Sequence, residues 1–162
     1  MTRRDLMTVA SLLPAWGATA QTSYQPAFLS AAEFGVLETF TGILIPSDET
    51  PGAREARVAQ YIDFVLNNAG EYASEVQRDW RKALDWLMAA NFGSLSAAEK
   101  LALVEQMASP KHGGFATFRL IKQMTVFAFY TSKAGLIDNL EYKGNAYLTE
   151  FPGCAHPEHR KV

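Results

Sequence analysis

The sequence lacks the residues and motifs on which most enzyme chemistry depends. It contains one cysteine, Cys154, so no disulfide bond can form within a single chain. It has neither a Gly-x-Gly-x-x-Gly nor a Walker-type phosphate loop, and no serine sits in a Gly-x-Ser-x-Gly elbow. The motif Cys-x-x-Cys-His, which attaches haem covalently, is also absent. Nucleotide binding, flavin binding, serine hydrolysis and c-type haem attachment therefore have no local support.

The sequence also lacks an excess of one charge and a long hydrophobic run. It carries 15 Lys and Arg against 17 Asp and Glu, and the basic residues are scattered, so nothing favours a nucleic-acid partner. No segment is apolar for long enough to span a bilayer. The composition of 48% hydrophobic and 20% charged residues is typical of soluble globular proteins. A length of 162 residues predicts one domain with a hydrophobic core.

The first twenty residues have the three parts of a bacterial export signal. The arginine pair Arg3-Arg4 precedes a mildly apolar stretch, and Ala18-Thr19-Ala20 has the small-x-small pattern of a cleavage site. The paired arginines and the modest hydrophobicity favour the twin-arginine route, so we expect residues 1–20 to be the signal and residues 21–162 to form the mature periplasmic domain. The alternative is an amphipathic N-terminal helix that begins with two arginines.

The mature sequence predicts an all-α fold. Apolar residues recur at helical spacing in segments bounded by turn residues, and no alternating run indicates a sheet. Two capping boxes, Ser30 to Glu33 and Ser96 to Glu99, mark helix starts. After Gly135 the periodicity fails, apart from a short helical turn. We expect one compact domain with an irregular C-terminal arm and about five helices, at 30–46, 53–68, 72–90, 96–109 and 115–133.

The apolar stripes of these helices predict which residues form the core. The stripe residues are Val58, Ile62, Val65 and Leu66; Val76, Trp80, Leu84 and Leu87; Leu101, Val104 and Met107; and Phe118, Ile121, Thr125 and Phe129. The helix over 115–133 is apolar around most of its circumference, which is typical of a central helix. The charged residues Glu55, Asp63, Glu71, Glu75 and Asp79 fit the pattern of solvated helix charges. Most aromatic side chains should be buried, and any left uncovered would form an interface.

A cysteine and two histidines lie close together near the C-terminus. Cys154, His156 and His159 could supply three ligands to zinc or a similar metal, although Pro157 prevents a shared helical face. The alternative is a surface arm whose polar groups bond a neighbour. Cys154 itself could be buried, form a disulfide with another subunit, or act as a reactive thiol. A Cys/His nucleophile pair lacks an oxyanion-hole signature.

The loop over residues 46–52 offers two adjacent carboxylates, Asp48 and Glu49. They could bind a cation or an arginine of another protein. The alternative is a solvated turn in which Asp48 caps the local backbone.

Four ordered motifs resemble those of the gluconate 2-dehydrogenase subunit 3 family. They are Ile45 to Ala53, Tyr130-Thr131-Ser132 with Gly135, Tyr142 to Asn145, and Pro152 to Pro157. The arginine pair at the start is also typical of this family. The resemblance covers nearly the whole chain, and it implies a small subunit of a membrane-associated sugar or sugar-acid dehydrogenase.

In such assemblies a large FAD-dependent flavoprotein of the glucose–methanol–choline type oxidises the substrate, and a cytochrome c subunit with haem c often accepts the electrons. The small subunit carries the export signal and is needed for maturation of the flavoprotein. The resemblance thus implies no cofactor and no catalytic residue in this chain, a twin-arginine translocase as a partner, and membrane association only through the complex. The motif residues become expected partner contacts: Pro46, Asp48, Tyr130, Tyr142, Asn145, Phe151, Cys154, His156 and His159. The alternative function is a small periplasmic metal-binding protein that uses Cys154, His156 and His159.

Overall fold

The computed structural model describes residues 24–69 and 74–144. Within these two ranges all regular structure is helical, as the apolar periodicity predicted. The elements are α2 (Ala31–Leu44), α3 (Val58–Asn68), α4 (Ser74–Ala89), the 3₁₀ turn η1 (Phe92–Ser94), α5 (Ala97–Met107), α6 (Phe115–Tyr130) and the π-helical turn η2 (Ala134–Asn139). The predicted export signal and C-terminal arm lie outside the described residues. No helix in the described ranges is both long enough and apolar enough to cross a bilayer.

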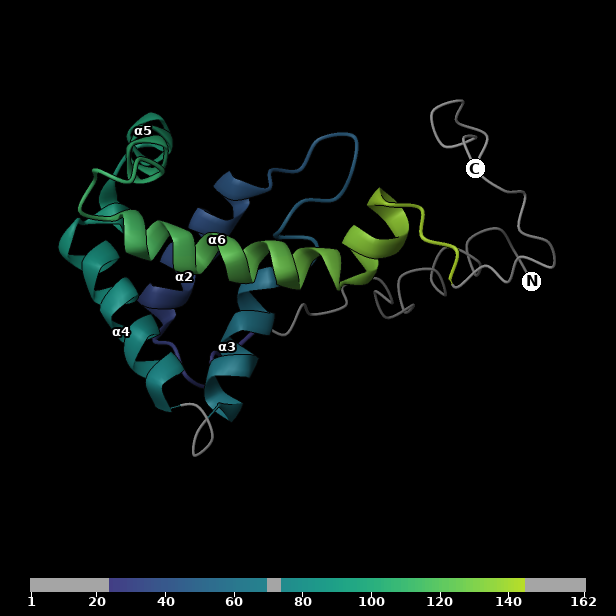
Figure 1. The fold of residues 1–162 in the computed structure, drawn as a ribbon, viewed down its shortest axis with the longest axis horizontal. Helices are drawn as coiled ribbons and strands as arrows, with labels where there is room; N and C mark the ends of the chain where they lie inside the picture. The colour runs from purple at the N-terminus through teal and green to yellow at the C-terminus, as the bar shows by residue number, and fades with distance from the viewer. Residues whose placement is uncertain (1–23, 70–73, 145–162) are drawn as a thin grey trace, which may run out of the picture.

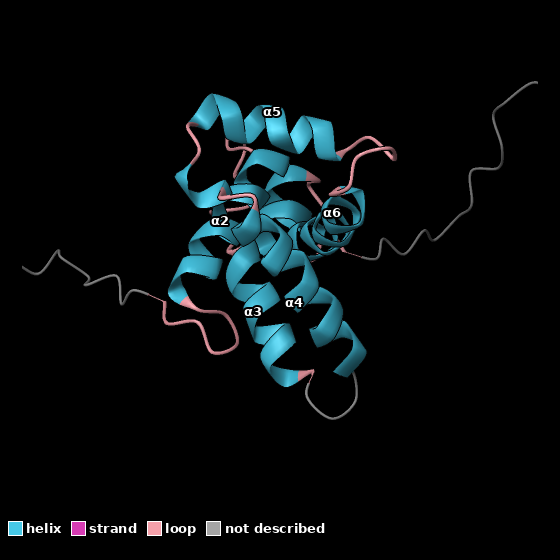
Figure 2. Ribbon diagram, turned by 90° about the vertical axis from the view of Figure 1, so that its left-hand side faces the viewer, coloured by secondary structure: helices cyan, strands magenta, loops and turns pink. Residues whose placement is uncertain are grey.

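Helix α6 is the centre of the domain. It packs against α2, α3, α4 and α5, and Figure 1 shows it crossing in front of the other helices. Figure 2 looks along α6, with α5 lying across one end of the bundle; Figure 1 shows α3 and α4 diverging from the end of α3 and the start of α4. The predicted stripe Phe118, Ile121, Thr125 and Phe129 is buried. The inner side of α6 is covered by these four helices, while part of its apolar circumference, including Phe127 and Tyr130, stays exposed.

Large aromatic and aliphatic side chains fill the core. Trp80, Phe40, Phe92 and Phe129 are almost completely buried, and the rings of Phe40 and Phe92 lie 5.5 Å apart between centroids. Burying a side chain of this size contributes about 1.5–3 kcal/mol relative to leaving it exposed. The core therefore joins residues from α2, α4, η1 and α6 into one unit.

Both predicted capping boxes are present. Ser30 accepts a hydrogen bond from the amide of Glu33 while the Glu33 side chain accepts one from the Ser30 amide, and Ser96 and Glu99 repeat this pattern. These contacts satisfy amides that the first helical turn leaves without partners, so the starts of α2 and α5 follow from local sequence.

Helix α3 begins at Val58, five residues later than predicted. The amide of Ala53 donates to the carbonyl of Ile45, which closes the preceding loop. Arg57 has a left-handed backbone with φ of 57°, so a continuous helix from Ala53 is impossible. Periodicity alone could not reveal this start, because the residues of the turn also suit a helix.

Helix α6 ends at Tyr130, three residues earlier than predicted. The Ser132 hydroxyl donates to the carbonyl of Phe129 and accepts from the amide of Gly135. A Cβ on Gly135 would overlap the Phe129 carbonyl oxygen, so only glycine fits where η2 folds back against the end of α6.

Two predicted core residues lie at the surface. Val76 is 38% exposed and Leu101 is 48% exposed. Val76 belongs to the first turn of α4, which lies at the end of that helix furthest from α6 (Figure 1). Leu101 belongs to α5, which covers only one end of the bundle (Figure 2). An apolar stripe indicates the face of a helix but not how far the neighbouring helices extend along it.

Candidate partner-binding surface

The loop between α2 and α3 is closed by its own side chains. Asp48 accepts hydrogen bonds from the amide of Thr50 at 2.8 Å and from its hydroxyl at 3.0 Å, while Glu55 accepts from the Ser47 hydroxyl and the Gly52 amide. The Thr50 amide, followed by the Thr50 hydroxyl, lowers the pKa of the exposed Asp48 carboxyl. Asp48 therefore caps the local backbone, which was one of the two alternatives for this loop.

This loop and η2 meet at one end of the molecule. The side-chain amide of Asn139 donates to the hydroxyl of Thr50 at 3.2 Å, although 89 positions separate them in the sequence. Tyr130 ends the helix that leads into η2, and the amide of Tyr142 donates to the carbonyl of Leu136 within it. Figure 1 shows the loop and η2 near the same end of α6. Tertiary structure thus brings three of the four motifs together.

Four of the predicted contact residues can be placed in the structure. Pro46, Asp48, Tyr130 and Tyr142 are exposed and belong to this end of the bundle. The other five lie outside the described residues: Asn145, Phe151, Cys154, His156 and His159.

Four exposed aromatic side chains form a surface on α3 and α6, which we call the aromatic face. Tyr61 and Phe64 lie three positions apart on α3, and Phe127 and Tyr130 lie three positions apart on α6. Their exposed fractions are 39%, 62%, 55% and 40% in that order. The rings of Tyr61 and Phe127 are 6.4 Å apart between centroids and join the two pairs.

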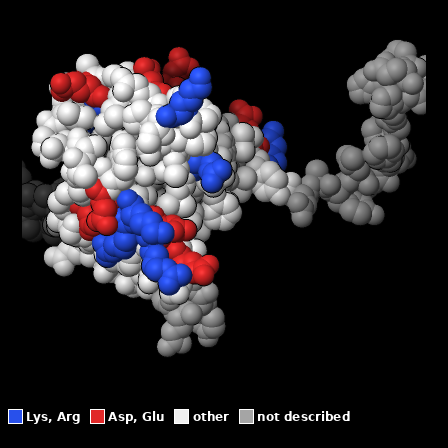
Figure 3. Space-filling model, turned by 60° about the vertical axis from the view of Figure 1, so that its left-hand side comes forward, with Lys and Arg blue, Asp and Glu red and all other residues white. Residues whose placement is uncertain are grey.

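The helices that carry the aromatic face have little charge near it, although the exposed Arg57 and Lys133 lie just outside them, before Tyr61 and after Tyr130. The only charged residue of α3 is the buried Asp63, and α6 carries none from Gln123 to Tyr130. The outer face of α4 is different: it carries the exposed ion pairs Arg78–Glu75 and Lys82–Asp79, and Figure 3 shows acidic and basic residues crowded together there. Protein interfaces are depleted in charge and enriched in aromatic residues at their centre. The aromatic face has that composition.

Asp63 corrects a prediction made from the sequence, because it is fully buried and not a solvated charge. Its carboxylate accepts hydrogen bonds from the amides of Ala27, Phe28 and Leu29, at 2.8, 3.0 and 2.8 Å, and from the hydroxyl of Tyr24 at 2.7 Å. Burial raises the pKa of Asp63, but the hydrogen bonds together lower it by more than burial raises it. The net shift of the pKa is therefore downward.

Burial and the contact with Asp63 also shift the pKa of Tyr24. Burial, followed by the hydrogen bond to Asp63 and its negative charge, raises the pKa of Tyr24 to about 12. The position of Asp63 could have been recognised from the sequence, because it shares the apolar stripe of α3 with Ala59, Ile62 and Leu66.

Arg81 holds the same segment from the side of α4. Its guanidinium donates to the carbonyl of Phe28 at 2.7 Å and to Glu33 at 3.0 Å, and it lies 4.0 Å from the centre of the Phe28 ring. We call Asp63 and Arg81 the N-terminal clasp. The clasp joins residues 24–29, the first that the structure describes, to α3 and α4.

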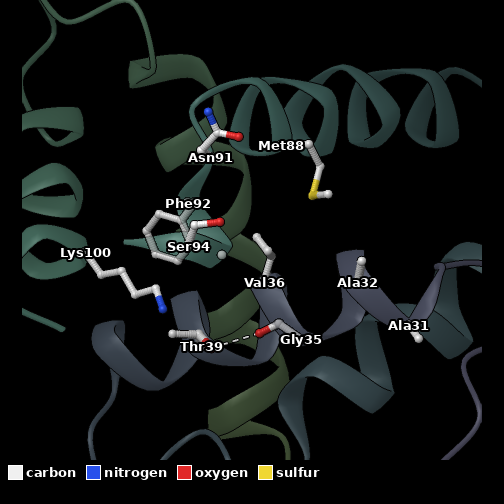
Figure 4. A pocket seen from close by; sticks show the side chains of 11 residues that line it. Ala31, Ala32, Gly35, Val36, Thr39, Met88, Asn91, Phe92, Ser94 and Lys100 are labelled. Carbon is white, nitrogen blue, oxygen red and sulfur yellow. Dashed lines mark hydrogen bonds between the residues drawn. The ribbon is translucent and has the colours of Figure 1, made fainter. Parts of the chain in front are cut away.

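A hollow of about 410 Å³ lies between α2 and the α4–η1 connection (Figure 4). Small residues of α2, Ala31, Ala32 and Gly35, form its floor, and Met88 and Asn91 form the opposite wall. Its one charged lining residue is Lys100, and the Thr39 hydroxyl donates to the carbonyl of Gly35. The hollow could accommodate a side chain of another protein. Its lining residues do not include an acidic and a basic group that could act together as a catalytic pair.

His112, the histidine outside the C-terminal cluster, makes structural contacts. His112 accepts a hydrogen bond from the amide of Gly114 at 3.0 Å and packs against the ring of Trp86. Among residues 24–69 and 74–144, no three His, Cys, Asp or Glu side chains come together in a way that could hold a metal ion.

Fold and surface together define a class: a small all-helical domain with an uncharged aromatic face of the composition found in protein interfaces. The chain belongs to the family described as gluconate 2-dehydrogenase subunit 3, whose family model matches residues 31–153. This confirms the resemblance drawn from the motifs and makes the chain a subunit of a multi-subunit dehydrogenase. No curated protein and no solved structure matches it.

Proposed function

We propose that this chain is the non-catalytic small subunit that binds a large FAD-dependent sugar or sugar-acid dehydrogenase, assists its maturation and carries it across the membrane by the twin-arginine route. The observation that supports this most strongly is membership of a dehydrogenase-subunit family over residues 31–153. FAD belongs to the large subunit and haem c to a cytochrome subunit. The complex works in the periplasm, and this chain reaches the membrane surface only through it.

The N-terminal clasp supports the export part of the proposal. The twin-arginine route transports folded proteins, so one signal can carry two chains if its own chain is folded and bound to the other. Only residues 21–23 separate the predicted cleavage site from Tyr24, where the clasp begins. Asp63 and Arg81 thus attach residues 24–29, which follow the predicted signal, to α3 and α4. The signal is therefore joined directly to the folded domain.

The test is to produce the large flavoprotein with this chain, without it, and with the Arg3→Lys/Arg4→Lys variant. Flavoprotein protein level and dehydrogenase activity are measured in periplasmic and cytoplasmic fractions. We expect periplasmic activity only with the intact chain, and retention of flavoprotein in the cytoplasm with the double lysine variant. Equal periplasmic activity in all three strains would refute the proposal.

A further inference from the structure

We propose that the aromatic face of α3 and α6 is the surface covered by the large catalytic subunit. This inference rests on the proposed function and adds the place of contact. The face consists of Tyr61, Phe64, Phe127 and Tyr130, all exposed in the isolated chain. Exposed aromatic clusters of this kind are unfavourable in water and mark interaction sites.

The size of the face fits the centre of an interface between two different subunits. An aromatic side chain buries about 150–250 Å² when fully covered. With 39–62% of each ring exposed, the four rings offer on the order of 400 Å². A standard interface buries about 800 Å² on each partner, whereas obligate homodimers bury considerably more. The face therefore supplies about half of what a standard interface buries on one partner, which fits its apolar centre.

The rim of the face is polar, and it includes the exposed basic residues Arg57, one turn before Tyr61, and Lys133, three positions after Tyr130. Gln123 precedes Phe127 by one helical turn, and Asn67 follows Phe64 by three positions; both are exposed. An apolar centre with a polar rim is the usual anatomy of a protein interface. The centre of the face is uncharged, so it suits an apolar, aromatic-accepting patch on a protein whose edge meets the basic side chains of Arg57 and Lys133.

The face is preorganised. Ile62 and Leu66 fix α3 from the opposite side, and Phe129 does the same for α6. Tyr61 and Phe127 already support each other across the two helices. Because rigid aromatic side chains on fixed helices lose little entropy on binding, most of their contact energy remains available for association.

Of the possible occupants, the large subunit is favoured by the family. The chain is a subunit of a multi-subunit dehydrogenase, so its surface must contact a different subunit. The face also includes Tyr130, which belongs to one of the motifs on which the family resemblance rests. The same end of α6 carries η2 and the loop that contains Asp48.

The test compares two double variants of the full chain. Phe64→Ser/Phe127→Ser removes the most exposed rings of the face, and Val76→Ser/Leu101→Ser removes apolar side chains of 38% and 48% exposure on α4 and α5. Affinity for the purified large subunit is measured by titration calorimetry, with circular dichroism to check folding. We expect the first variant to weaken binding by about 100-fold or more, as loss of two interface anchors does, and the control by less than about threefold.

The outcomes separate this inference from the proposed function. If wild type binds the large subunit and the Phe64→Ser/Phe127→Ser variant binds equally well, the proposed function stands and the aromatic face is not the interface. If wild type fails to bind and export proceeds without the chain, the proposed function itself falls.

Two further measurements examine the other occupants. If light scattering shows an isolated wild-type dimer that the face variant converts to a monomer, a second copy occupies the face and the inference is overturned. If the face variant lowers the melting temperature of the isolated full chain while the control does not, a segment of the same chain covers the face, which also overturns it.

Discussion

One carboxylate, Asp63, holds a segment that lies 34 to 39 positions earlier in the chain. An ionised carboxylate can accept several hydrogen bonds at once, and here every donor belongs to Tyr24 or to residues 27–29. The four contacts compensate for burying a charge, which would otherwise be very costly. At the residue scale, the N-terminal attachment of this domain depends on that balance.

Replacing Asp63 by asparagine should therefore destabilise the domain. Asparagine keeps the size but loses the charge, and its NH₂ group faces backbone amides that need an acceptor. We expect a loss of about 2–4 kcal/mol in the free energy of unfolding, measured by urea denaturation. The control Asp79→Asn alters an exposed ion pair and should change stability by less than about 0.5 kcal/mol. Equal effects of the two substitutions would contradict the buried clasp.

Stability should also depend on pH through Asp63 and Tyr24. The pKa of Asp63 is lowered by folding, so its contribution is complete above the unfolded value of about 3.9 and is lost as the pH falls through the folded pKa. The pKa of Tyr24 is raised to about 12, so its contribution is complete below the unfolded value of about 10 and is lost as the pH rises through the folded value.

Urea denaturation of wild type and of the Asp63→Asn and Tyr24→Phe variants, carried out from acid pH to above about pH 10, measures both effects. The stability gap between wild type and Asp63→Asn should narrow in acid, and the gap to Tyr24→Phe should narrow above about pH 10. Gaps that stay constant with pH would show that neither group is linked to folding.

At the scale of the elements, helix starts with capping boxes were predictable and those set by loops were not. Ser30 and Ser96 mark α2 and α5 because the cap and its partner lie three residues apart. The start of α3 depends instead on the contact between Ala53 and Ile45, eight positions apart. A local pattern cannot report a bond whose partner is chosen by the path of a loop.

Two glycines, Gly35 within α2 and Gly52 in the loop before α3, give a direct test of this distinction. A Cβ at Gly35 in α2 would meet no atom within 4 Å, whereas one at Gly52 would lie 2.6 Å from the backbone nitrogen of Ser47. We expect Gly35→Ala to raise the free energy of unfolding by about 0.5–1 kcal/mol through helix propensity. Gly52→Ala should lower it by more than about 1 kcal/mol, because the clash is with backbone. Thermal or urea denaturation measures both, and a loss of stability in Gly35→Ala would contradict the open space seen there.

At the scale of the whole molecule, the motifs of the family converge. The loop with Asp48, the end of α6 at Tyr130, and η2 lie far apart in sequence and near one end of the bundle in space. The described residues end at Gly144, five positions after the last residue of η2. Within the described part of the chain, Tyr130 of the aromatic face thus lies at the same end of α6 as the Asp48 loop and η2.

The C-terminal motif has its own test. If Cys154 bridges to the large subunit, non-reducing electrophoresis of the purified complex should show one covalent heterodimer that reducing agent separates. The Cys154→Ser variant should abolish the covalent species. Free migration of both chains without reductant would exclude the bridge. Metal analysis of the wild-type chain settles the alternative, since a site built on Cys154, His156 and His159 requires one bound ion per chain.

The sequence by itself determined the helical fold, the capped starts of α2 and α5, the central place of α6 and the family, because each depends on neighbouring residues or on ordered motifs. Only the tertiary structure decided that Asp63 is buried, that Val76 and Leu101 are exposed, and that Tyr61 and Phe127 meet on one face. Spacing along a helix indicates which side chains share a face. Which faces are covered depends on the lengths and crossing positions of other helices, and these are properties of the assembled bundle.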